Sequence, residues 1–168
     1  MPPTPDTNLT HQDSDRAGEC GTGVSVDRSL SSIFQTFSGT EPTDSELASI
    51  APISLAYIGD AVFELYVRSQ LLIPAKRLRD YHEQVVAQVK TEQQAHYVDV
   101  LTPYLTEAEK DVMRRGRNAT SGRNRRANAQ DYQKATGFEA LIGFLYISDQ
   151  ARLFNLLNQL SVNANASV

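Results

Sequence analysis

Residues 55–68 read LAYIGDAVFELYVR, a stretch in which apolar residues recur at three- and four-residue steps and one carboxylate, Asp60, interrupts them. This spacing predicts a helix with a buried face. Pro52 suits the first turn of that helix, and Pro74 ends it. An ionised carboxylate is costly to bury without a compensating partner, so the presence of Asp60 needs a reason.

The glycine that precedes this aspartate supplies part of the reason. Glycine in a helix interior costs about 1 kcal/mol relative to alanine, so Gly59 indicates the close approach of another element or of a ligand. A second apolar stretch, TGFEALIGFLY at residues 136–146, shows the same combination. In that stretch Glu139 lies among apolar residues, with Gly137 and Gly143 nearby.

Two apolar helices that each carry an acid and glycines are expected to cross closely, with Asp60 and Glu139 converging. Converging carboxylates cannot both stay ionised in a dry site without a cation. Oxygen ligands favour Mg²⁺, with Mn²⁺ as the alternative. The pattern alone leaves open a salt-bridged or capping role for Asp60. Glu64 is a further candidate metal ligand, but an ion pair with Arg68 at i+4 is the interpretation that we favour.

The rest of the chain also predicts helices, and no Val-, Ile- and Thr-rich alternation predicts a strand. Beyond Pro74, residues 76–101 predict a short helix followed by a longer one. Three further helical segments follow, at residues 107 to about 117, 131–147 and 149–160. Thr106 and Glu109 form a capping box before the second segment. Residues 118–129 read as a loop. The predicted fold class is therefore all-α.

Charge and composition divide the chain. Residues 1–47 hold two basic and eight acidic residues, a net charge of −6, whereas residues 48–168 hold 14 basic and 12 acidic residues, a net charge of +2. Residues 1–28, rich in Pro, Thr, Asp, Ser and Gly, predict a disordered acidic leader. Residues 29–46 predict a short docking segment that includes a helix at 29–37. Residues 47–160 form the expected domain, and residues 161–168 form a frayed tail.

Composition excludes several classes of protein. Cys20 is the single cysteine, so no internal disulfide can form, and no Cys/His cluster has the spacing of a zinc site. A reducing compartment such as the cytoplasm fits this composition. No apolar run reaches the roughly 20 residues of a membrane span. The leader has neither the apolar stretch of a signal peptide nor the low acid content of a transit peptide.

A basic stretch, RRGRNATSGRNRR, occupies residues 114–126. Arginine guanidinium groups match phosphate oxygens, so this stretch predicts sequence-independent contacts with a nucleic-acid backbone. A solvated charged loop is the alternative. No aromatic residue interleaves the arginines, so a duplex is favoured over stacked single-stranded bases. The candidate RNA-binding residues are Arg114, Arg115, Arg117, Asn118, Arg123, Arg125 and Arg126.

The stretches LAYIGDAVFELYVR, RRGRNA and ATGFEALIGFLY, in this order and spacing, resemble the Mini-ribonuclease III branch of the ribonuclease III family from about Leu47 to Leu160. The family implies an all-α endonuclease domain that forms a homodimer and has no double-stranded-RNA-binding domain. The eight residues after Leu160 are too few for such a domain. The family also implies Mg²⁺-dependent cleavage of double-stranded RNA, typically the precursor of 23S ribosomal RNA. A ribosomal protein that presents the RNA is a further expected partner.

By this resemblance, Asp60 and Glu139 match the family's catalytic, metal-binding aspartate and glutamate. Larger ribonuclease III enzymes have two further acids, at positions where this chain has Ala56 and Thr136, and the Mini-III branch resembles this chain at both. Two other classes compete with the nuclease. The first is a catalytically silent RNA-binding module of the same fold, and the second is a helical interaction domain that would leave the arginines unexplained.

Overall fold

The computed structural model describes residues 39, 40, 42–120 and 129–162. The expected leader, the helix at 29–37, three of the arginines (Arg123, Arg125 and Arg126) and residues 163–168 lie outside this part of the chain. Within it, the elements are α2 (Asp44–Ser49), α3 (Pro52–Leu71), α4 (Leu78–Val89), α5 (Thr91–Leu101), the 3₁₀ helix η1 (Thr102–Tyr104), α6 (Glu107–Ala119), α7 (Ala129–Ser148) and α8 (Gln150–Leu157). No described residue belongs to a strand, so the all-α prediction is confirmed.

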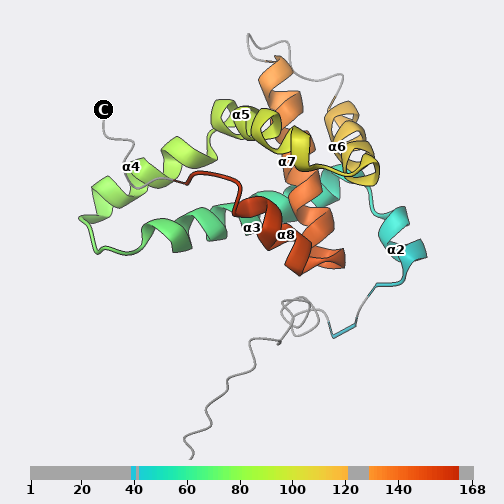
Figure 1. The fold of residues 1–168 in the computed structure, drawn as a ribbon, viewed down its shortest axis with the longest axis horizontal. Helices are drawn as coiled ribbons and strands as arrows, with labels where there is room; N and C mark the ends of the chain where they lie inside the picture. Colours follow the sequence, from blue (N-terminus) through green and yellow to red (C-terminus); the bar gives the residue numbers. More distant parts are fainter. Residues whose placement is uncertain (1–38, 41, 121–128, 163–168) are drawn as a thin grey trace, which may run out of the picture.

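Helix α7 is the centre of the fold. It packs against α3, α5, α6 and α8, and Figure 1 shows α5 and α6 on either side of its N-terminal half. The core is formed by the apolar faces of these helices. Its largest fully buried side chains are Phe63, Phe138, Leu55, Leu71, Leu101, Leu141, Ile142, Leu153, Leu156, Leu157 and Val67.

Glycines set how closely the helices approach α7. A Cβ atom on Gly59 would lie 1.9 Å from the carbonyl oxygen of Glu139, and one on Gly143 would lie 2.0 Å from that of Leu55. Both distances are far below van der Waals contact, so α3 and α7 can cross this closely only with glycine at both positions. The predicted close crossing is therefore confirmed. Gly137 faces the backbone of α6 instead, since its Cβ would lie 2.8 Å from the carbonyl oxygen of Met113.

The predicted capping box of Thr106 and Glu109 forms. Thr106 accepts a hydrogen bond from the backbone N–H of Glu109, and the Glu109 carboxylate accepts one from the backbone N–H of Thr106. The same carboxylate is buried and pairs with Arg152 at 2.8 Å, which ties the start of α6 to α8. The cap thus fixes the direction in which α6 leaves toward the basic stretch.

Two sequence expectations need correction. Residues 76–101 were expected to form a short helix and then a longer one, but α4 has 12 residues and α5 has 11. The first turn of α4 is exposed, so its buried apolar positions begin only at Val85. Helix α6 continues to Ala119, beyond the expected start of a loop at residue 118. Helix α2 spans residue 47, where the domain was expected to begin, and the domain boundaries stay a prediction.

Candidate active site

Asp60 and Glu139 line one open pocket of about 460 Å³, between the N-terminal half of α3 and the middle of α7. Asp60 is exposed and Glu139 is half-buried. The sequence placed Asp60 inside a buried segment, and this was wrong, because α3 buries only the face that contains Leu55, Gly59 and Phe63. The two carboxylates are nevertheless brought together, as the glycine-flanked acids predicted.

The pKa values of both acids in the pocket are raised. Burial and the negative charge of Asp60 raise the pKa of Glu139 to about 7. Partial desolvation by the surrounding protein, and then the charge of Glu64, raise the pKa of Asp60 above its ordinary value, although its side chain stays accessible to solvent. No ion pair joins Asp60 or Glu139 to a basic side chain in the described part of the chain. The repulsion between the pair is therefore left for a cation from solution to relieve.

The donor set suits a hard divalent cation. Both side chains offer carboxylate oxygens, which are the ligands that Mg²⁺ and Mn²⁺ prefer. Within the described ranges no group of three or more Asp, Glu, His or Cys side chains gathers. The pair thus fits a cation that keeps most of its water ligands, as Mg²⁺ commonly does.

Ala56 and Thr136 line the same pocket. By the resemblance described above, these are the positions at which larger enzymes have two additional acids, and here both side chains are uncharged. Thr136 is buried, and its hydroxyl donates to the carbonyl oxygen of Tyr132 at 3.0 Å. That hydroxyl is therefore engaged within α7. The pocket presents the acidic charge of Asp60 and Glu139 alone among its lining residues.

Glu64 lies one turn beyond Asp60 and pairs with Arg68 at 2.6 Å. This is the i+4 ion pair that the sequence favoured. Glu64 still raises the pKa of Asp60 through its charge. We therefore describe it as a neighbour of the site that already has a cationic partner.

Gln94 is the residue that the sequence analysis missed. It lies on α5 with only 2% of its surface exposed, and hydrogen bonding by its side chain acts to lower the pKa of both Asp60 and Glu139 against the causes that raise them. A signal was present in the sequence: Gln94 precedes Tyr97, Val98 and Leu101 by three, four and seven residues. A polar residue on the apolar stripe of a helix indicates a buried hydrogen-bonding role.

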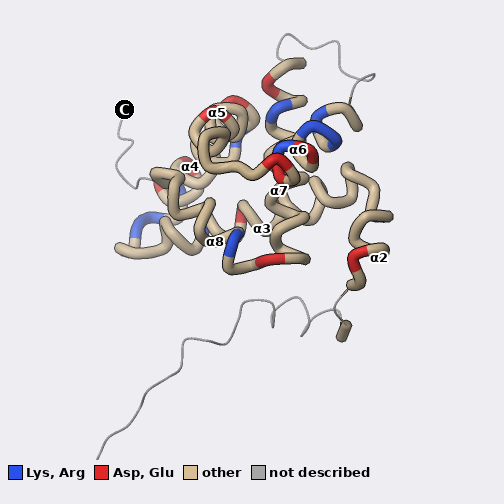
Figure 2. The backbone as a smooth tube through the Cα atoms, turned by 45° about the vertical axis from the view of Figure 1, so that its right-hand side comes forward, with Lys and Arg blue, Asp and Glu red and all other residues tan. Residues whose placement is uncertain are grey.

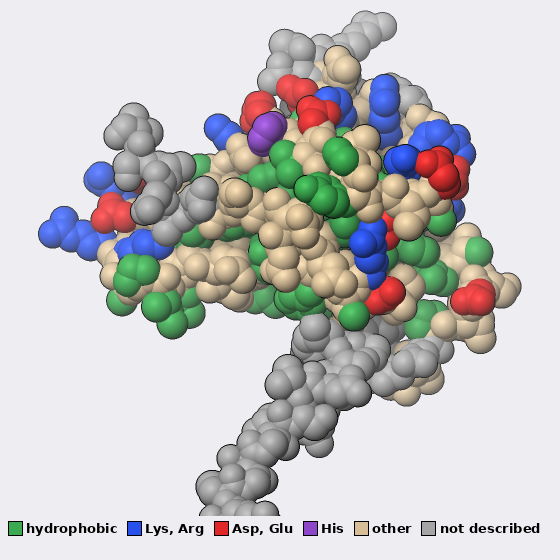
Figure 3. Space-filling view, in the orientation of Figure 1, with side chains coloured by type: hydrophobic (Ala, Val, Ile, Leu, Met, Phe, Trp, Pro, Cys, Tyr) green, Lys and Arg blue, Asp and Glu red, His purple; other side chains and the backbone are tan. Residues whose placement is uncertain are grey.

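The arginines of α6 do not form one uniform surface. The basic stretch contains no acid, but Asp111, on the preceding turn, pairs with Arg114 at 2.5 Å and with Arg115 at 3.1 Å. These arginines lower the pKa of Asp111. Lys and Arg positions still colour part of α6 in Figure 2, and basic side chains gather over this helix in Figure 3. The two pairs reduce the net charge that Arg114 and Arg115 offer to a ligand.

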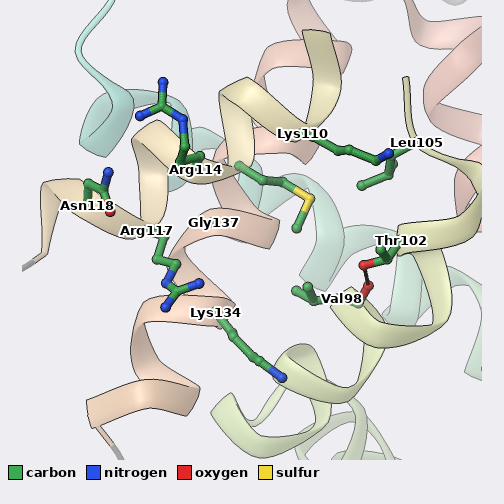
Figure 4. Close-up of a pocket in the computed structure, with 10 residues that line it drawn as sticks. Val98, Thr102, Leu105, Lys110, Arg114, Arg117, Asn118, Lys134 and Gly137 are labelled. Atoms are coloured by element: carbon green, nitrogen blue, oxygen red, sulfur yellow. Dashed lines mark hydrogen bonds between the residues drawn. The ribbon is translucent and has the colours of Figure 1, made fainter. Parts of the chain in front are cut away.

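A separate basic pocket lies between α5, α6 and α7 (Figure 4). Arg117 and Lys134 extend into it from α6 and α7, over apolar side chains that include Val98 and Leu105. Lys134 pairs with Asp99 at 3.0 Å, whereas Arg117 has no ion pair among the described residues. Arg117 is thus the basic side chain of this pocket that is best able to bind a phosphate.

The basic pocket and the carboxylates lie on opposite sides of α7. Lys134 and Gly137 line the former, and Thr136 and Glu139 line the latter. At about 100° per residue, the two sets point in nearly opposite directions from the helix axis. A phosphate held by Arg117 is therefore a different phosphate from one held at the carboxylates.

Comparison with known proteins agrees with this arrangement. The profile of the ribonuclease III domain family matches residues 53–150, which include both carboxylates and the arginines of α6. A Mini-ribonuclease 3 of Synechocystis is 51% identical over 121 residues, covering 71% of this chain and 85% of the relative. This chain belongs to the Mini-ribonuclease 3 branch of that family. It is a ribonuclease III-type endoribonuclease.

A second relative and a solved structure extend the comparison. The Mini-ribonuclease 3 of Thermosynechococcus vestitus is 44% identical, covering 71% of this chain and 79% of that protein. A crystal structure of a protein from Fusobacterium nucleatum has a TM-score of 0.60 and 25% identity, covering 66% of this chain and 90% of that one. The helical fold of this ribonuclease III domain is thus shared with a solved structure. None of the described helices combines the length and hydropathy of a membrane span.

The raised pKa of Glu139 predicts how the stability of the metal-free enzyme depends on pH. Because the pKa is about 7 in the fold and about 4.5 in the unfolded chain, the folded state binds more protons between these values. Stability should therefore fall as the pH rises through this window. The E139Q variant removes the charge and should be more stable than wild type at about pH 8, by up to about 3 kcal/mol.

Thermal denaturation in EDTA at about pH 8 and about pH 4.5 measures this effect. The difference between E139Q and wild type should nearly vanish at the lower pH, where Glu139 is protonated. Added Mg²⁺ should stabilise wild type more than E139Q, because a ligand stabilises the state that binds it. An equal difference at both pH values would contradict the prediction.

Proposed function

We propose that this endoribonuclease cleaves double-stranded RNA in the cytoplasm at a Mg²⁺ site formed by Asp60 and Glu139, with Mn²⁺ as the alternative. The observation that carries the proposal is the convergence of two carboxylates with raised pKa values in an open pocket. Neither has a basic partner among the described residues. Two neighbouring carboxylates without basic partners repel each other, so the pair contributes little to the stability of the fold and is well suited to bind a cation.

The two carboxylates would hold the cation by their oxygens. A bound divalent cation supplies Lewis-acid stabilisation of charge on a phosphoryl oxygen. The protein's part is to hold both acids on one side of α7 and to leave the pocket accessible to a phosphodiester. Ionisation of Glu139 requires a pH near or above 7 in the metal-free enzyme, so cation binding should weaken as the pH falls below this value.

Removal of metal tests the proposal. The full chain should cleave a labelled RNA duplex in Mg²⁺ and leave it intact in EDTA, with activity restored when Mg²⁺ is returned. A single-stranded RNA of the same sequence is the control and should be cut more slowly. Duplex binding without cleavage in Mg²⁺ would favour the silent RNA-binding module, and neither binding nor cleavage would favour an interaction domain.

The basic residues are proposed to bind the duplex backbone. They comprise Arg114, Arg115, Arg117 and Asn118 of α6, with Arg123, Arg125 and Arg126 beyond it. Because Arg117 and the carboxylates lie on opposite sides of α7, this contact should position the duplex away from the scissile phosphate. Such contacts are independent of sequence and sensitive to salt.

The R117Q variant tests the basic pocket. Loss of one phosphate contact should weaken duplex binding and reduce the slope of log affinity against log salt by about 1. R79Q is the matched control, because Arg79 is exposed on α4 and pairs with Glu83. Titrations of a labelled duplex at several salt concentrations measure both. Equal slopes for R117Q and R79Q would reject a specific role for Arg117.

The enzyme is proposed to act as a homodimer. Three large apolar residues of α3, Ile53, Tyr57 and Leu65, are 50%, 86% and 65% exposed. Leu65 also lines an apolar groove with Phe154 of α8. A second copy of the chain that covers these residues would place two carboxylate pairs in one assembly. Sedimentation of the chain reports its mass in solution and decides the point.

The physiological substrate is proposed to be the precursor of 23S ribosomal RNA, presented by a ribosomal protein. Support comes from membership of the Mini-ribonuclease 3 branch. Cleavage of the naked precursor can be compared with cleavage of the precursor in an assembled particle. Faster, site-specific cutting in the particle would support a presenting protein, and equal rates would remove the need for one.

A further inference from the structure

Tyr132 of α7 lines the same open pocket as the two carboxylates of the proposed active site. It precedes Glu139 by about 20° less than two full helical turns, so both side chains leave α7 in nearly the same direction, about 10 Å apart along the helix axis. Thr136 lies between them on this face and donates its hydroxyl to the Tyr132 carbonyl oxygen at 3.0 Å. Tyr132 is thus placed where the nucleotides beside a phosphodiester at the acids can reach it.

Hydroxyl groups are the polar side-chain groups that this pocket offers besides the two acids. Among the described residues its lining contains no lysine, arginine, amide or histidine side chain, and the hydroxyls belong to Ser54, Tyr57, Tyr132 and Thr136. The Thr136 hydroxyl is already engaged within α7. The Tyr132 hydroxyl has no hydrogen bond to any described residue, since the only recorded bond of Tyr132 outside the helix ladder is made by its carbonyl oxygen. This hydroxyl is therefore available to a substrate.

Tyr132 has a better-defined position than the other two available hydroxyls. It is 40% exposed, so more than half of its surface is covered by the protein, whereas Tyr57 is 86% exposed and belongs to the surface that a second copy is proposed to cover. Ser54 is exposed, and its short side chain stays close to the backbone of α3. A tyrosine carries its hydroxyl on a rigid ring with two side-chain torsions, so it can contact a ligand at a low cost in conformational entropy.

The charge of the pocket decides which part of an RNA strand this hydroxyl meets. A second phosphate beside Tyr132 would be repelled by Asp60 and Glu139 and would find no basic side chain among the described lining residues. The ribose carries no charge, and its 2′-hydroxyl both donates and accepts hydrogen bonds, as the tyrosine hydroxyl does. The 2′-hydroxyl is also the group by which a protein distinguishes RNA from DNA.

We propose that Tyr132 is a specificity-determining residue of this nuclease, and that its side-chain hydroxyl hydrogen-bonds the 2′-hydroxyl of a ribose close to the scissile phosphodiester. The inference rests on the proposed cleavage of duplex RNA at Asp60 and Glu139. The basic side chains contact phosphates, which RNA and DNA share. Tyr132 adds a contact with the sugar itself, so it favours RNA over DNA next to the bond that is cut.

The test combines one change in the enzyme with one change in the substrate. Wild type and Y132F cut a set of RNA duplexes, each with a single 2′-deoxy nucleotide at a different position near the cleavage site, and kcat/KM is compared with that for the all-ribose duplex. For wild type, one position should lower kcat/KM by roughly three- to tenfold, the size expected for one neutral hydrogen bond. Y132F should lose a similar factor on the all-ribose duplex and show no further loss at that position.

Y104F is the matched control, because Tyr104 is 52% exposed on η1 and does not line the carboxylate pocket. It should show the same 2′-deoxy effect as wild type. Thermal denaturation should give Y132F the stability of wild type, since the lost hydroxyl has no partner in the described part of the chain. An equal 2′-deoxy effect in Y132F and wild type, or no effect at any position in wild type, would overturn the role of Tyr132 and leave the nuclease assignment standing. Failure of wild type to cut the all-ribose duplex in Mg²⁺ would reject the proposed function and the role of Tyr132 with it.

Discussion

The D60N variant should fold, bind duplex RNA and cleave it about 10²–10³-fold more slowly than wild type in Mg²⁺. Asparagine keeps the shape of the side chain but removes one of the two negative charges that the pocket offers to a cation. The lost electrostatic stabilisation of the transition state should therefore reduce kcat, while RNA affinity, which is proposed to depend on basic side chains away from the pocket, should stay nearly constant. Single-turnover cleavage of a labelled duplex measures the change.

E64Q is the matched control for D60N. Glu64 lies one turn away and already pairs with Arg68 at 2.6 Å, so removing its charge should change the cleavage rate less than a few-fold. It should also allow the pKa of Asp60 to fall toward its ordinary value, because the charge of Glu64 helps to raise it. A loss in E64Q as large as that in D60N would make Glu64 a third metal ligand. Undiminished cleavage by a folded D60N would reject the catalytic assignment.

The sequence predicted the carboxylate pair because its signals were local. Each acid has a glycine within a few residues, and a helical glycine in an apolar stretch has few explanations other than close packing. The structure supplies the geometry, since Gly59 lies against the backbone of Glu139 itself. Gly59 therefore permits the close crossing of α3 and α7, and the next residue, Asp60, is the acid that this crossing brings near Glu139.

The exposure of Asp60 could not be predicted in the same way. Periodicity records which residues are apolar, and Ile53 and Tyr57 belong to the three- and four-residue spacing that predicts a buried face. Both are exposed in the structure. Apolar residues that pack within their own chain and apolar residues that stay exposed can have the same spacing. Only the three-dimensional arrangement separates the two faces of α3.

Gln94 was missed for a related reason. Its partners are on α3 and α7, so no local pattern connects it to either acid. The basic stretch shows the converse effect. A run of arginines with no acid reads as uniformly cationic, yet helical geometry brings Asp111 back onto Arg114 and Arg115. Contacts at i+3 and i+4 are predictable in principle, but only when the helix is known to continue through the run.

Substitution of Gly59 by alanine should cause the largest loss of stability in the domain. In an ordinary helix interior this change stabilises by up to about 1 kcal/mol. Here the new Cβ would lie 1.9 Å from the carbonyl oxygen of Glu139 and 2.7 Å from the backbone nitrogen of Gly143, so α3 and α7 would have to separate. We expect G59A to lose roughly 3–5 kcal/mol, a size that core overpacking reaches when backbone must move.

Chemical denaturation in EDTA measures this loss without a contribution from metal binding. G143A should behave like G59A, because its Cβ would lie 2.0 Å from the carbonyl oxygen of Leu55. G116A should lose less, since its closest contact, at 2.6 Å, is the Cβ of Ala140 and not backbone. S69A, on the exposed side of α3, should be nearly neutral. A stabilised G59A would mean that the two helices do not cross at this distance, and the convergence of Asp60 with Glu139 would lose its structural basis.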